Sequence, residues 1–162
     1  MSAILLPYTR NCFVCGAQNP SGLRLRFRFE DGAVRAEFQP RATLEGYRGV
    51  VHGGVIASAL DDTMFWAAAY ARRQFLVSVE MAVRYQQKVA VDAPYRLVAR
   101  LVREQRKLCF VEAELRGADD AVCASATGKF FPLAPTAVPL HPEDFVNDPQ
   151  TLAPAEFWPR NG

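Results

Sequence analysis

The residues best suited to chemistry lie in one short run, His52-Gly53-Gly54 followed by the acidic pair Asp61-Asp62. Residues 55–73 contain neither proline nor glycine and are rich in alanine, so they predict a helix. Glycines before a helix leave its first N–H groups unobstructed, at the positive end of the helix dipole. Such N–H groups suit a polarised carbonyl oxygen or an anion. The alternative is that the glycines only make a tight turn and the histidine only caps backbone groups.

The acidic pair stands in a helix that is apolar on nearly every face, which predicts a buried helix. Burying an ionised carboxylate is costly unless it is paired or hydrogen-bonded. Asp61 and Asp62 point about 100° apart, so at most one of them needs to be buried. One acid in a shielded cleft would serve as a nucleophile or general base. The alternative reading places both acids on a polar edge.

An alternation of apolar and polar residues predicts strands on both sides of this helix. Residues 23–30 alternate without a break, Asp31-Gly32 predicts a turn, and residues 34–38 resume the pattern. Four more strands are predicted at residues 76–86, 95–104, 108–116 and 121–131. An antiparallel sheet that must bury an apolar helix has to curl around it. The predicted fold is therefore α+β, a curved antiparallel sheet wrapped around one long central helix.

Such a sheet still has its outer face and its edges to cover, which favours a homodimer formed through edge strands, or a dimer of dimers. The last residues have a different composition, because seven of the eleven prolines fall between 132 and 162. We therefore expect one domain over residues 1–132 and a proline-rich tail over 133–162 packed on its surface. Phe145, Phe157 and Trp158 are the expected anchors of that tail.

The four cysteines, at positions 12, 15, 109 and 123, predict neither a metal site nor a disulfide. Cys12 and Cys15 form a lone CxxC pair, which supplies two zinc ligands at most, so we expect reduced thiols. A symmetric hairpin would place Cys109 near Gly128 and Cys123 near Glu114. The two thiols would then not face one another, which argues against a disulfide.

Composition excludes several classes of function. The chain has 162 residues, half of them hydrophobic, and a net charge of +2, which is typical of one globular domain. The basic residues do not cluster, so no nucleic-acid partner is expected. The apolar stretch 53–71 is interrupted by both acids and residues 1–10 lack a signal-peptide pattern, so we expect a cytoplasmic protein without membrane association. No nucleotide or cofactor fingerprint is present.

Four features together resemble the hotdog thioesterase superfamily, in particular the PaaI-type acyl-CoA thioesterases. They are the opening from Cys12 to Leu23, the His52-Gly53-Gly54 turn, Asp61 nine residues beyond His52, and the strand from Ser78 to Tyr85. The resemblance spans residues 11–132 and implies a hotdog fold. It also implies hydrolysis of an acyl- or aryl-CoA thioester to a free acid and coenzyme A. Coenzyme A would be part of the substrate, and no cofactor is implied.

The resemblance also assigns roles to residues. The acid at Asp61 would attack the thioester or activate water, while the Gly53 N–H would bind the thioester oxygen. His52 would orient the turn, and Ser78 on the following strand would help hold the water or the carboxylate. Gly54 and Met64 would contact the substrate. Asp62 matches no required position.

Two other functions remain open at this point. A hotdog hydratase or dehydratase would need a histidine and an acid arranged for proton transfer at the acyl chain, and no second histidine is near the helix. A non-catalytic acyl-CoA-binding module would leave the acid in the buried helix unexplained. The identity of the acyl group does not follow from the sequence.

Overall fold

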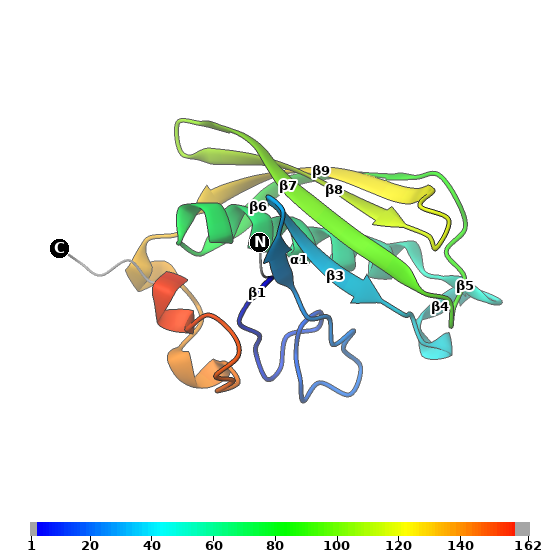
Figure 1. The fold of residues 1–162 in the computed structure, drawn as a ribbon, viewed down its shortest axis with the longest axis horizontal. Helices are drawn as coiled ribbons and strands as arrows, with labels where there is room; N and C mark the ends of the chain where they lie inside the picture. The colour runs from blue at the N-terminus through cyan, green and yellow to red at the C-terminus, as the bar shows by residue number, and fades with distance from the viewer. Residues whose placement is uncertain (1–2, 158–162) are drawn as a thin grey trace.

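A computed structural model describes residues 3–157 of the chain. One antiparallel sheet curves over a single long helix, as predicted (Figure 1), and it has seven strands, one more than the six predicted, because Ile4–Leu5 also pairs in it. The strand order across the sheet is β1-β2-β3-β7-β8-β9-β6, and a separate two-stranded sheet, β4-β5, precedes the helix. The bounds are β1 Ile4–Leu5, β2 Arg28–Glu30, β3 Ala33–Phe38, β4 Glu45–Tyr47, β5 Val50–Val51, α1 Gly53–Arg72, β6 Leu76–Tyr85, β7 Tyr95–Gln105, β8 Leu108–Arg116 and β9 Val122–Pro132.

Helix α1 is the centre of the core. It begins at Gly53, two residues before the predicted start, and Arg73 ends it in the left-handed conformation of a helix C-cap. Its buried face packs mainly against β7 and β8. Leu60 and Met64 are fully buried there, together with Leu97 of β7 and Leu115 of β8. The helix is among the most buried elements of the protein because its apolar residues are spread around the whole circumference.

The strand predicted at residues 23–30 is wrong in its first part. Only Arg28–Glu30 pairs in the sheet, although Leu25 and Phe27 are buried and Arg24 and Arg26 are exposed, as the alternation predicts. The backbone of this segment is held by a loop instead, because the N–H groups of Leu23 and Leu25 donate to the carbonyls of Phe13 and Val14. Alternating burial therefore continues where no strand ladder forms.

The β8–β9 hairpin has a register different from the predicted one. Cys109 lies opposite Phe130 rather than Gly128, and Cys123 falls at an irregularity near Leu115 and Arg116 rather than opposite Glu114. The symmetric folding assumed from the sequence fails for two reasons: Arg116 pairs with Val122 rather than with Ala121, and the extra residue at the irregularity shifts the pairing by one more. Both cysteines are free thiols, as predicted.

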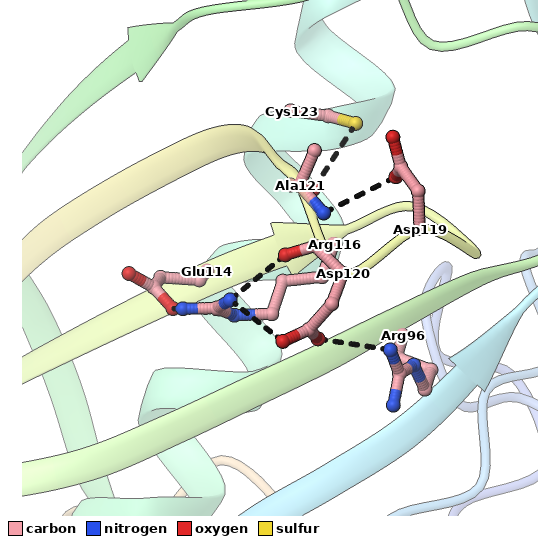
Figure 2. A network of polar contacts seen from close by, with 7 residues as sticks. All are labelled: Arg96, Glu114, Arg116, Asp119, Asp120, Ala121 and Cys123. Carbon is pink, nitrogen blue, oxygen red and sulfur yellow. Dashed lines mark hydrogen bonds and ion pairs between the residues drawn. The ribbon is translucent and has the colours of Figure 1, made fainter.

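The turn of this hairpin is held by a network of charged side chains (Figure 2). The Asp120 carboxylate lies 2.9 Å from the Arg96 guanidinium of β7 and 3.4 Å from that of Arg116 on β8. Asp119 accepts a hydrogen bond from the Ala121 N–H. Most of these side chains are well exposed to solvent, so each ion pair contributes on the order of 1 kcal/mol or less.

Strand β6 lies at the edge of the large sheet and pairs only with β9 among the described strands. Ten residues long, it carries four large exposed side chains, Val77, Val79, Met81 and Tyr85. A long apolar edge with unpaired backbone groups is a surface to which another strand can add.

The proline-rich tail and the N-terminal segment lie on the side of α1 away from β8 and β9 (Figure 1). Phe145 and Phe157 of the tail are buried and pack against Phe75, and Phe157 also meets Trp66 edge-on. The tail therefore supplies part of the core. Trp158, the third expected anchor, lies outside the described residues. Within residues 3–157, no helix has the length and apolar character needed to cross a membrane.

Candidate active site

The first half of the site is the turn that starts α1. His52 is the helix N-cap, and its Nδ1 accepts the Gly54 N–H at 3.0 Å. A nitrogen that accepts a hydrogen bond carries no proton, so a neutral His52 has its proton on Nε2. The ring packs against Gly46, where a Cβ would lie 2.9 Å from His52 Cδ2. The histidine ring is thus held by the hydrogen bond to Gly54 and by its packing against Gly46.

The Gly53 N–H is the free donor of this turn, because it finds no hydrogen-bond acceptor among residues 3–157. The hydroxyl of Tyr85 donates to the Gly53 carbonyl at 2.9 Å and so joins the end of β6 to the start of α1. A cavity of about 400 Å³ opens at this place, lined by His52, Gly53, Tyr85 and Lys88 among others. The sequence did not identify Tyr85 as a site residue, since only the contact with Gly53 distinguishes it from other exposed strand residues.

The second half of the site is Asp61, two turns further along α1. Its Oδ1 is buried and has no hydrogen-bond partner within the described part of the chain. Burial raises the pKa of the Asp61 carboxyl above its usual value, while the nearby Ser78 hydroxyl of β6 lowers it. An unpaired oxygen on a buried carboxylate is uncommon, because such groups normally find a partner. The arrangement leaves Asp61 able to accept a proton or attack an electrophile.

Asp62 faces a different part of the molecule. Its Oδ2 accepts a hydrogen bond from the thiol of Cys12 on the N-terminal segment, at an Sγ–Oδ2 distance of 3.8 Å. Burial raises the pKa of Asp62 as well, and the neighbouring Cys12 and Asp61 add to this effect. Both acids are therefore partly buried, and the alternative that both lie on a polar edge is wrong.

The predicted site residues form two groups within one protomer. His52, Gly53 and Gly54 meet at the helix start, and Asp61 lies near Ser78. Eight residues of helix separate Gly53 from Asp61, which corresponds to about 12 Å, and Asp61 does not line the cavity at Gly53. Met64 is fully buried and packs beneath Gly128 of β9, so its predicted contact with substrate finds no exposed surface in the protomer.

Comparison with known proteins agrees with this fold. Residues 48–124, which include the helix start, α1 and Ser78, match the family model of the thioesterase superfamily. A crystal structure of a thioesterase superfamily protein superposes with a TM-score of 0.70 at 26% identity, covering 75% of this chain and 60% of that protein. A conserved protein of Pseudomonas aeruginosa is 33% identical, with a TM-score of 0.58 over 64% of this chain and 82% of its own.

A protein of Streptococcus mutans, bound to acetyl CoA, is 20% identical with a TM-score of 0.60. That match covers 65% of this chain and 84% of the Streptococcus protein, and at this identity it shows the fold alone. The helix wrapped by a curved antiparallel sheet is the hotdog fold. The chain belongs to the thioesterase superfamily.

Proposed function

We propose that this protein is an acyl-CoA thioesterase of the PaaI type, which hydrolyses an acyl- or aryl-CoA to the free acid and coenzyme A. The observation that carries the proposal is the buried Oδ1 of Asp61, which has no hydrogen-bond partner among the described residues and lies on a largely apolar helix. A binding module has no use for such a group, whereas thioester hydrolysis requires a base or nucleophile. Membership of the superfamily and the relative bound to acetyl CoA support the same substrate class.

The reaction needs two groups at one thioester. Asp61 either removes a proton from a water that attacks the carbonyl carbon, or attacks that carbon itself to form an acyl anhydride that a water then hydrolyses to the free acid. The carbonyl oxygen gains negative charge, which the Gly53 N–H stabilises at the positive end of α1. The carbon–sulfur bond then breaks, and the coenzyme A thiolate leaves and takes up a proton. Ser78 helps to position the carboxylate or the water, and no cofactor takes part.

One protomer does not hold both groups near one reacting atom, because each must lie about 3 Å from it and the helix separates them by about 12 Å. Pairing of edge strand β6 with a second copy of the chain would bring the two groups together. The Ser78 half of β6 lies near Asp61, and its other end, Tyr85, binds Gly53. If β6 pairs antiparallel with a second copy about an axis near its middle, Ser78 comes close to the partner's Tyr85. Asp61 then lies beside the partner's Gly53, and a dimer has two identical sites.

The experiment that tests the function is thioester hydrolysis by the Asp61→Asn variant. The change is almost isosteric and removes only the charge, so we expect hydrolysis to fall by about a hundredfold or more while acyl-CoA binding persists. Because burial disfavours the charged carboxylate, the melting temperature should not fall. The assay follows free thiol release over short, long and aryl acyl-CoAs.

The matched control is Asp120→Asn, which removes a carboxylate from the hairpin network in Figure 2. Asp120 has a positive φ of 66°, a conformation that asparagine also tolerates. This variant should hydrolyse thioesters like the parent protein. If the parent binds acyl-CoA without releasing thiol, the protein is a binding module. A gain or loss of a double bond in the acyl chain would instead indicate a hydratase or dehydratase.

A further inference from the structure

Three potential metal ligands meet where the N-terminal segment contacts Asp62 of α1. The Sγ atoms of Cys12 and Cys15 and a carboxylate oxygen of Asp62 all lie within 4.8 Å of one another. The Cys12 thiol lies 3.8 Å from Asp62 Oδ2. The sequence predicted two ligands at most, because the third comes from a helix 50 residues further along the chain.

These separations suit a tetrahedral cation. Zinc lies about 2.3 Å from thiolate sulfur and about 2.0–2.2 Å from carboxylate oxygen, so its ligand atoms are roughly 3.5–3.8 Å apart. The Cys12–Asp62 separation already has this value. Shifts of less than about 1 Å bring the remaining atoms to the same spacing. Two sulfurs and one oxygen favour a thiophilic divalent ion over magnesium or calcium.

The loop that carries the two cysteines is shaped before any ion arrives. The Val14 N–H donates to Cys12 Sγ at 3.3 Å, and the Gly16 N–H donates to the Cys12 carbonyl at 2.9 Å. A Cβ at Gly16 would lie 2.2 Å from that carbonyl oxygen, so only glycine permits this tight turn. N–H groups aimed at a ligand sulfur stabilise its thiolate form, which is the form that binds metal.

A second layer of contacts holds the ligands in place. The buried Thr9 hydroxyl accepts the Cys12 N–H at 3.1 Å and lies 3.7 Å from Cys15 Sγ. Outer contacts of this kind orient ligands in metal sites. All three ligands also line a cavity of about 430 Å³, whose walls include Phe65 and Trp66. A fourth coordination position therefore opens into this cavity.

We propose that Cys12, Cys15 and Asp62 bind one thiophilic divalent cation of the Zn²⁺ class. The two cysteines bind as thiolates and Asp62 binds as a carboxylate, any proton that they carry passes to solvent, and a water from the cavity completes the tetrahedron. The ion ties the N-terminal segment to α1 at the residue next to Asp61. Its role is structural and it takes no part in thioester hydrolysis. This site replaces the sequence-based expectation of two unliganded thiols.

The test uses the full chain, stripped with a chelator in the presence of a reductant, and titrated with Co²⁺ and then with Zn²⁺. We expect one Co²⁺ per protomer, a thiolate-to-cobalt charge-transfer band, and loss of that band when Zn²⁺ displaces the cobalt. Cys12→Ser and Asp62→Asn should each weaken Zn²⁺ affinity by at least about tenfold. Zn²⁺ should raise the melting temperature of the parent far more than that of either variant.

The matched control is Cys123→Ser, which changes a buried thiol at the β8–β9 hairpin (Figure 2), outside the cluster. It should bind one ion like the parent. The proposal is wrong if the reduced parent shows no thiolate–cobalt band, or if Cys12→Ser and Asp62→Asn bind like the control. A Cys12–Cys15 disulfide that forms in air while the reduced protein binds no ion would equally overturn it. Should Cys12→Ser fail to fold, Asp62→Asn, which keeps the side-chain shape, decides the outcome. These readouts do not depend on thioester hydrolysis.

Discussion

Replacing Gly53 by proline or by alanine separates the role of its N–H from the role of its small size. Gly53 is the first residue of α1, a position where proline is well tolerated because its N–H has no partner within the helix. His52 has φ −62° and ψ 135°, which suits a residue before proline. Either substitution adds a Cβ about 3.3 Å from the Tyr85 ring, so both disturb Tyr85 similarly. Only Gly53→Pro removes the donor.

The expected magnitudes follow from this difference. Loss of one oxyanion donor lowers kcat by about 10²–10³, so Gly53→Pro should lose hydrolysis by that factor. Gly53→Ala keeps the N–H and should lose much less. If alanine and proline reduce hydrolysis equally, the defect is steric and the N–H has no catalytic role.

Mixing two inactive variants then tests whether the site is shared. Asp61→Ala and Gly53→Pro are unfolded and refolded together, and thiol release is measured against each variant refolded alone. Random pairing makes half of the dimers mixed, and each mixed dimer has one doubly damaged site and one intact site. About a quarter of the parent activity should therefore return. If both variants fold and form mixed dimers without regaining activity, the two-subunit site is refuted.

Two further changes test the edge strand and the tail. Val79→Lys on the exposed edge of β6 should convert the proposed dimer to a monomer and abolish hydrolysis. Val102→Lys, at a matching irregularity of β7, should do neither. Light scattering after size exclusion measures the mass. Retention of the dimer by Val79→Lys would contradict pairing through β6. Phe157→Ala should lower the free energy of unfolding by roughly 3 kcal/mol, because it removes a fully buried ring from its contacts with Trp66 and Phe75. Denaturant unfolding measures this loss, and an unchanged midpoint would mean that the tail is not part of the core.

The sequence alone determined the elements whose signal is local. Residues 53–72 form the central helix because their own composition favours it and because apolar side chains surround the helix axis. The strands after the helix follow from alternation over nine to eleven residues each. The position of an acid inside the apolar helix likewise needs only the sequence, and so does its distance from the glycine turn.

Tertiary structure decided what depends on residues far apart in the chain. Residues 23–27 have the alternation of a strand, yet the N–H groups of Leu23 and Leu25 donate to a loop, because the pattern sets burial and not the backbone partner. The apolar pattern of the helix also left open which acid faces β6. Asp61 lies near Ser78 and Asp62 meets Cys12, because the N-terminal segment packs on the opposite side of α1. The contact of Tyr85 with Gly53 likewise joins residues 32 positions apart. Such pairings depend on how whole elements pack, and no local period carries that information.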